Sequence, residues 1–316
     1  MQGEITTRHP SLGYCCVSLG KYESKFKTTT LSWAKGTTKA KAVEKLLKLW
    51  ENNLEELSRV LNYNISAGIR LYRMSSDLFP LADHPKYEKI WDDFSSLKST
   101  NTQPWREARN AVAEFISAKG RLTFHPGQYV SIGSPQKNTR NSAIKNLELH
   151  GTIMSLLDLP ETHESPINIH LSNGKDNIQL LPYFTDTLSR LSTKVKKRLV
   201  FETEDKSFWT WQKITKYFPE YPVTLDSHHH RINNEGDTLE EAFASCAKSW
   251  GSITPVVHVS EGKTEELDRA HHDWVNSIPN AFYSEGTPNK LKADIEIEAK
   301  KKDLAVLYLQ SRYRLN

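Results

Sequence analysis

The sequence predicts an α/β fold, a TIM (β/α)₈ barrel with long loops at its C-terminal face. Short apolar runs with the character of buried strands alternate with stretches of helical periodicity from one end of the chain to the other. Nearly every apolar run ends on a histidine or a carboxylate. Because a parallel barrel brings its strand ends to one mouth, this pattern predicts a single convergent site rich in metal ligands.

Eight runs have the length and composition of strands buried on both faces. In chain order they are LGYCCVS (12–18), GIRLYRMSS (68–76), RLTFHPGQY (121–129), SPINIHLS (165–172), RLVFETED (198–205), YPVTLDSHHH (221–230), TPVVHVSE (254–261) and ADIEIEAK (293–300).

Helical periodicity fills the intervals between these runs. The predicted helices cover 38–61, 105–118, 139–157, 177–191, 208–217, 238–248, 264–277 and 301–311. A parallel crossover usually needs a helix, so eight such units imply a closed barrel. An open doubly wound sheet is the competing fold. The glycine-rich stretch 127–133 lacks GxGxxG spacing, which disfavours a dinucleotide-binding fold.

Length and composition indicate one catalytic domain over residues 1–316, since a barrel of this type needs about 250 residues. Mean hydropathy of -0.60 fits a soluble enzyme, and no run approaches the roughly 20 apolar residues that span a bilayer. The first 14 residues lack the layout of a secretory signal. Three cysteines, Cys15, Cys16 and Cys246, make a poor disulfide framework, so we expect a cytoplasmic protein.

The formal net charge is only +4, but the lysines are clustered. Eight of them lie between Lys21 and Lys48, and shorter clusters occupy 194–198 and 300–302. These clusters are candidate phosphate contacts. For any one cluster alone, a solvated helix face or loop is the simpler interpretation. The connections 21–35 and 78–104 are long, which places them among the expected functional loops.

Spacing within the last three predicted strands points to metal ligands. Asp226 and His229 form a D-x-x-H pair after the sixth strand, and His258 ends the seventh. Glu296 and Glu298 alternate with isoleucines on the eighth strand, so both carboxylates face one side. A charged pair that faces a barrel interior costs several kcal/mol unless a cation compensates it. The inward position of Glu298 therefore predicts that its carboxylate binds a cation.

The candidate ligands are histidines and carboxylates at or soon after strand ends. They are His125, His170, Glu202, Asp226, His229, His258, His271 and Glu298. Eight ligands exceed one tetrahedral site and suffice for two or three cations with bridging carboxylates. Mixed nitrogen and oxygen sites suit Zn or Mn rather than Ca or Mg. Cations about 3.5–4 Å apart are the arrangement that hydrolyses phosphodiesters. A single histidine at a strand end is more often structural, and Glu296 is an outer-shell or surface candidate.

Several strings together carry a resemblance to a known family. They are LGY (12–14), MSSDLFPLADHP (74–85), RLTFHPGQY, the strand of Glu202, the D-x-H-H and H-x-D segments, and EAK. In this order they resemble the ultraviolet damage endonuclease family over residues 12–307. The resemblance implies a TIM barrel, a manganese cluster that often holds three ions, and nicking of duplex DNA immediately 5′ of a lesion to leave a 3′-hydroxyl and a 5′-phosphate.

Position by position, the resemblance also assigns roles. The implied metal ligands are His84, His125, His170, Glu202, Asp226, His229, His258, His271 and Glu298. Within this set the expected catalytic residues are Glu202, His125 and His170 near the attacking water, and His229 and His271 near the leaving group. The implied DNA and lesion contacts are Tyr14, Gln128, Tyr129 and Lys175.

The chain departs from the family pattern at a few positions. Val256 stands two residues before His258, where family members carry a lysine. Ser18 and Thr203 replace expected asparagines, and residues 171–174 replace an expected glycine pair. The chain is therefore identified as a divergent member, whose substrate range and metal occupancy depend on these changes.

We therefore expect a manganese-dependent DNA repair endonuclease, with Zn or Mg as the other candidate ions, that acts on damaged double-stranded DNA as a monomer without a membrane partner. An abasic-site endonuclease of the endonuclease IV type is an alternative on the same fold. A metal-dependent sugar isomerase is another, although it leaves the lysine clusters without a use. A catalytically dead DNA-binding barrel is the alternative from another class.

Overall fold

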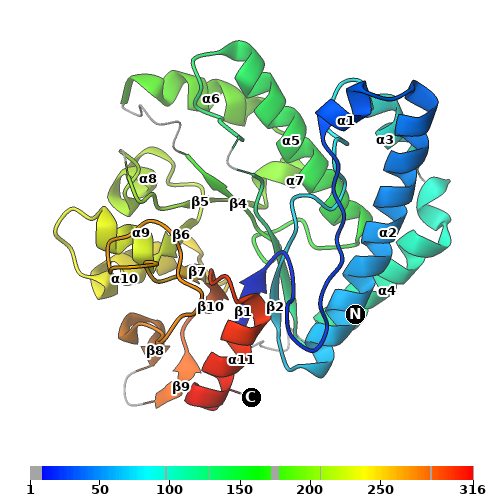
Figure 1. Cartoon of the computed structure of the whole chain (residues 1–316). Coiled ribbons are helices and arrows are strands. Elements are labelled where there is room, and N and C mark those ends of the chain that lie inside the picture. Colours follow the sequence, from blue (N-terminus) through cyan, green and yellow to red (C-terminus); the bar gives the residue numbers. More distant parts are fainter. Residues whose placement is uncertain are drawn as a thin grey trace, which may run out of the picture.

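Eight parallel strands close into a barrel that carries helices on its outside (Figure 1). The computed structural model describes residues 9–96, 98–127, 129–171, 178–206, 208–284 and 287–315. The strand order around the barrel is β1-β10-β7-β6-β5-β4-β3-β2, and the ring closes where β1 pairs with β10. The predicted TIM barrel is confirmed.

All eight barrel strands lie within the predicted apolar runs. They are β1 Leu12–Cys15, β2 Leu71–Met74, β3 Arg121–Phe124, β4 Ile167–His170, β5 Leu199–Glu202, β6 Val223–Asp226, β7 Val256–Val259 and β10 Asp294–Ile297. A small antiparallel pair, β8 (Tyr283–Ser284) with β9 (Thr287–Leu291), lies outside the barrel and was not predicted.

The helices of the described residues are α1 Leu31–Lys35, α2 Lys39–Ser66, α3 Glu88–Phe94, α4 Gln103–Ser117, α5 Lys137–Leu156, α6 Leu181–Arg190, α7 Thr193–Lys196, α8 Trp211–Tyr217, α9 Ser227–Ile232, α10 Leu239–Ser249 and α11 Lys302–Tyr313. Seven of them, α2, α4, α5, α6, α8, α10 and α11, correspond to predicted helices with shifted ends, and the short helices α1, α3, α7 and α9 were not predicted. Short 3₁₀ turns occupy Ser99–Asn101, Ile178–Leu180 and Asn280–Phe282.

The predicted helix over 264–277 is wrong. This segment is an irregular loop, closed by an antiparallel bridge between Gly262 and His271. The Asp268 carboxylate accepts hydrogen bonds from the backbone N–H groups of Thr264 and Ala270. An aspartate that bonds to nearby backbone in this way offers the chain an alternative to a helix.

The long connection 78–104 is held by a cluster of aromatic side chains. Phe79 stacks on Trp105 of α4 with ring centroids 5.5 Å apart, and Trp50 of α2 meets Trp91 of α3 edge-on at 5.7 Å. Trp50 also donates its indole N–H to the Pro80 carbonyl. Aromatic pairs of this kind contribute beyond the area they bury, so the connection after β2 is packed in place rather than loose.

Strand alternation divides the barrel residues into two sets. Outward side chains such as Leu12 and Tyr72 join the large hydrophobic core under the helices. The inward set is polar above a floor formed by Val200 and Val256 with Trp250. Arg121 and Asp294 pair beside this floor at 2.8 Å, and both are buried. Above this pair, charged side chains occupy the barrel interior toward the carboxyl ends of the strands. The candidate site lies at that end.

In the described part of the chain, no helix has the length and apolarity that a membrane-spanning segment requires.

Candidate metal centre

The ends of neighbouring strands place candidate ligands side by side. In the parallel registers, His170 of β4 pairs with Glu202 of β5, and Asp226 of β6 pairs with His258 of β7. His258 in turn pairs with Glu296 of β10. Because parallel strands end at one edge, residues far apart in sequence become neighbours there, as the spacing predicted.

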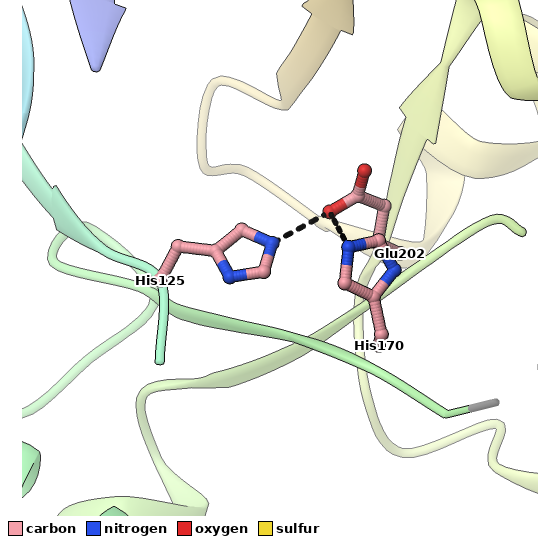
Figure 2. A group of neighbouring side chains, drawn as sticks. All are labelled: His125, His170 and Glu202. Carbon is pink, nitrogen blue, oxygen red and sulfur yellow. Dashed lines mark hydrogen bonds and ion pairs between the residues drawn. The ribbon is translucent and has the colours of Figure 1, made fainter. Parts of the chain in front are cut away.

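Glu202 lies at the centre of this group. Its Oε2 atom is 3.0 Å from His125 Nε2 and 3.8 Å from His170 Nε2, and Figure 2 shows both imidazole rings directed at this carboxylate. Its Oε1 atom is 3.1 Å from His258 Nδ1 and 3.5 Å from His229 Nδ1. Four histidines from four segments therefore surround one buried carboxylate.

The candidate ligands form three overlapping groups. Within each group, the donor atoms all lie within 4.8 Å of one another. The groups are His125 with His170 and Glu202, Glu202 with Asp226 and His229, and Asp226 with His258 and Glu298. Glu202 and Asp226 each belong to two groups. A carboxylate has two oxygens, so it can bridge two cations, and the described residues offer adjacent nitrogen and oxygen sites of mixed character.

The two carboxylate oxygens of Asp226 have different surroundings. Oδ1 accepts the backbone N–H groups of His228 and His229 and so caps the N-terminus of α9. Oδ2 is buried and accepts no hydrogen bond from the described residues. An unpaired buried carboxylate oxygen is costly, and a bound cation would satisfy it.

The charges within the cluster shift each other's protonation. Burial opposes charge on His258, yet the Glu202 and Glu298 carboxylates raise its pKa well above the ordinary value. Burial likewise opposes charge on His170, but Glu202 and Glu204 raise its pKa to about 9. For Glu202, burial favours the neutral acid, but His258 and His170 hold its pKa well below the ordinary range. Without a metal the imidazoles carry the positive charge that the carboxylates require. Cations would displace those protons.

His125 behaves differently from these two histidines. Burial lowers its pKa, which outweighs the opposing effect of its contact with Glu202. It therefore stays neutral near pH 7, and a neutral imidazole is the form that binds a metal.

Arg73 is a cation that sequence reasoning did not assign to the site. It comes from β2, and its Nη2 atom lies 2.5 Å from Glu298 Oε1 while Nη1 lies 3.3 Å from Glu296 Oε2. The predicted need of this carboxylate pair for a cation is thus met in part by a guanidinium. The feature of the sequence that could have identified it is its position in the apolar run LYRM. A buried arginine on a barrel strand needs a partner of opposite charge inside the protein.

Three further polar groups hold two ligands and the neighbouring Glu296 in place. Asn168 Nδ2 donates to Glu202 Oε2 at 2.6 Å, and Glu204 Oε1 lies 3.4 Å from His170 Nδ1. Thr123 donates its hydroxyl to Glu296. Such partners orient metal ligands and are as much a part of a metal site as the ligands themselves.

Two predicted ligands lie outside the three groups. His271 reaches the edge of the cluster, with Nδ1 3.7 Å from Glu298 Oε2. His84 is half-buried, and its Nδ1 accepts a hydrogen bond from the backbone N–H of Lys86. Their roles as ligands stay predictions.

The predicted lesion contacts have different positions. Tyr129 is 85% exposed in the loop after β3. Tyr14 is fully buried under α2, where its hydroxyl donates to Asn64 Oδ1 at 2.8 Å, so it faces the helical layer rather than the barrel interior. Gln128 and Lys175 lie outside the described residues.

Comparison with known proteins gives this geometry a context. A family model described as UV-endonuclease UvdE matches residues 10–315. The chain belongs to this family. A UV DNA damage endonuclease of Bacillus cereus (strain B4264) is 30% identical over 303 residues, which cover 94% of this chain and 92% of that protein. Membership in the UvdE family supports a DNA repair endonuclease.

Two solved structures are similar to this chain. The crystal structure of SacUVDE superposes with a TM-score of 0.79 at 25% identity, covering 97% of this chain and 98% of that one. A 3-keto-D-glucoside 4-epimerase from E. coli, YcjR, superposes with a TM-score of 0.55 at 13% identity over 97% of this chain and 100% of that one. This second likeness shows the shared barrel fold alone.

Proposed function

We propose that this UvdE-family protein is a metal-dependent endonuclease that nicks duplex DNA immediately 5′ of ultraviolet photoproducts. The observation that carries the proposal is the buried Glu202 carboxylate, which belongs to two adjacent ligand groups and faces four imidazoles. Adjacent cation sites bridged by carboxylates suit phosphodiester hydrolysis. We further propose one catalytic domain that acts as a monomer.

The donor set fits cations that accept both imidazole and carboxylate. We propose two or three manganese ions, with zinc or magnesium as the other candidates. The ligands would come from the three groups above, with His271 and His84 added at the edges. When bound, the ions would lower the pKa of a water and offset charge on the phosphate oxygens.

We assign the side chains around the ions to two parts of the reaction, the attacking water and the leaving group. His125, His170 and Glu202 face one another on the β3–β5 side of the mouth, which is where we place the attacking water. His229 and His271 lie toward β6 and β7, which is where we place the leaving group. This division rests on the family resemblance, and the positions of the residues on two sides of the mouth support it.

Tyr129 would supply the recognition of damage, together with Gln128. Its ring is 85% exposed, although most large aromatic side chains of this protein are buried. An exposed aromatic beside an active-site mouth can stack on a base or fill a gap in the duplex. A damaged step is already weakly stacked, so opening it costs less than opening an intact step, and that difference gives selectivity.

The direct test is cleavage of end-labelled duplexes by the purified protein after metal removal and readdition. Mn²⁺ should restore a single nick immediately 5′ of a photoproduct, with 3′-hydroxyl and 5′-phosphate ends. An intact irradiated duplex under these conditions would refute the proposal. Preference for an abasic duplex over the irradiated one would assign the abasic-site alternative instead.

A further inference from the structure

Three lysines project from one side of the segment that leaves β1. From residue 21 to residue 27, exposed and half-buried side chains alternate. Lys21, Lys25 and Lys27 are on the exposed side, and Tyr22 and Phe26 turn inward against the hydrophobic core. We refer to Lys21, Lys25 and Lys27 as the lysine ridge. The exposed Glu23 lies among them and leaves the ridge with a net positive charge.

The backbone beneath the ridge is fixed by a buried glutamate. Glu56 of α2 is 2% exposed, and its Oε1 atom accepts the Lys25 backbone N–H at 2.6 Å. The same oxygen accepts the Tyr22 hydroxyl at 2.7 Å. Burying a carboxylate is costly unless it is hydrogen-bonded, so this residue has a specific role in ordering the segment.

A buried asparagine fixes the far end of the ridge and ties it to the barrel mouth. Asn53 of α2 is fully buried, and it both accepts the Lys27 N–H at 3.0 Å and donates to the Lys27 carbonyl at 2.9 Å. Its amide also donates to the Leu78 carbonyl at 3.0 Å. Leu78 follows the carboxyl end of β2, so the ridge lies at the same end of the barrel as the metal centre.

The near end of the segment is held by α11. Asp303 Oδ1 accepts the backbone N–H of Leu19 at 2.6 Å, and its Oδ2 accepts that of Gly20 at 3.0 Å. Because α11 begins just after β10, this anchor also belongs to the mouth of the barrel. Figure 1 shows the segment in dark blue, running from β1 alongside α2 toward α1.

We propose that the lysine ridge is a preformed contact surface for the phosphate backbone of duplex DNA. The ridge combines clustered positive charge, a location at the active-site end and a backbone held by three carboxylate or amide side chains. Lysines contact phosphates without reading sequence, and their contribution is electrostatic. A backbone ordered in advance loses less conformational entropy on binding. The proposal rests on the proposed function for its choice of DNA as the partner.

The test compares two triple variants that remove the same charge from opposite ends of the barrel. The ridge variant is Lys21→Gln, Lys25→Gln, Lys27→Gln. The control is Lys119→Gln, Lys216→Gln, Lys248→Gln, which changes exposed lysines that precede β3, β6 and β7 and so lie at the other end. Affinity for a labelled undamaged duplex is measured by fluorescence anisotropy in EDTA over a range of KCl concentrations.

The ridge variant should show a shallower dependence of log affinity on log salt. The slope should fall by about 0.9 for each phosphate that a lysine no longer neutralises, or about 2.7 for three. The control triple should keep the wild-type slope, and a Lys→Arg triple at the ridge should restore it. Equal slopes for the ridge variant and the wild type, or an equal fall in slope for both triples, would overturn the proposal.

This assay is independent of cleavage, so the two proposals can fail separately. If the wild type nicks irradiated DNA but the ridge variant keeps its salt slope, the ridge assignment is wrong and the endonuclease stands. If the wild type does not nick irradiated DNA but binding depends on the ridge, the endonuclease is wrong and the ridge stands.

Discussion

The Nε2 atom of His258 lies 3.1 Å from Oε2 of Glu296, both of them fully enclosed by the barrel. The other ring nitrogen, Nδ1, lies 3.1 Å from Glu202 Oε1. Glu296 is itself held by Thr123 and lies 3.3 Å from Arg73. The imidazole is therefore fixed from behind by one carboxylate and presents its opposite nitrogen to the candidate metal ligands.

Glu296→Gln should weaken metal binding although Glu296 belongs to none of the three ligand groups. Loss of the outer carboxylate removes the charge that orients His258, and such changes typically cost about 10–100-fold in metal affinity. Titration calorimetry with Mn²⁺ would measure the loss. Glu266→Gln, which changes an exposed glutamate, serves as the control. Equal Mn²⁺ affinity in Glu296→Gln and the control would show that Glu296 has no such role.

Glu202→Gln should reduce both the number of ions bound and cleavage. The amide keeps the size of the side chain but loses the charge that two ligand groups share. We expect a fall in cleavage rate of at least about 100-fold, because electrostatic stabilisation is usually the largest catalytic contribution. Metal content by mass spectrometry and cleavage of an irradiated duplex are the measurements.

Binding of DNA gives the control for the same variant. Glu202 is buried at the centre of the ligand group, so salt-dependent affinity for undamaged duplex should stay at the wild-type value. Cleavage at the wild-type rate by Glu202→Gln would remove this residue from the mechanism.

Tyr129→Ala should leave stability unchanged and reduce selectivity for damage. The side chain is 85% exposed, so its removal creates no cavity. Stacking of an aromatic on a base contributes about 1–3 kcal/mol, which corresponds to roughly 5–150-fold in the ratio of affinities for irradiated and intact duplex. Tyr308→Ala on α11 is the control, since Tyr308 is also partly exposed. An unchanged ratio in Tyr129→Ala would exclude the recognition role.

His150 should make the protein sensitive to acid independently of the metal centre. It is 1% exposed against Phe124, its Nδ1 bonds to the Asn146 carbonyl, and burial lowers its pKa to about 4. The unfolded chain takes up a proton as pH falls below about 6.5, whereas the folded chain does so only near 4. Above pH 6.5, His150 is neutral in both states and does not reduce the free energy of unfolding. As pH falls from 6.5 toward 4, only the unfolded chain binds the proton, and the folded state loses stability.

Urea unfolding in EDTA at pH 7.5 and pH 5 would measure this contribution. Over that interval the wild type should lose about 2 kcal/mol more than His150→Gln. His9→Gln, which changes an exposed histidine, should behave as the wild type does. An equal loss in the wild type and His150→Gln would show that His150 is not the acid-sensitive group.

Much of the architecture was readable from local pattern. All eight barrel strands fall within apolar runs that the sequence marks, and Glu296 and Glu298 share a face as alternation requires. The loop after β7 was not readable in the same way. The Asp268 carboxylate accepts hydrogen bonds from nearby backbone N–H groups, and these override the helical spacing of the loop. Spacing alone does not reveal such bonds.

The sequence by itself determined the barrel and the kinds of ligand at its strand ends, because the alternation of strand-like and helical periodicity is a local property that repeats eight times. Only the tertiary structure decided which charged side chains pair with one another. Arg73 and Glu298 are 225 residues apart, yet they pair at 2.5 Å, and Tyr14 turns toward Asn64 and away from the interior. Such pairings depend on strand register and closure around the barrel, which bring together residues that no sequence interval relates.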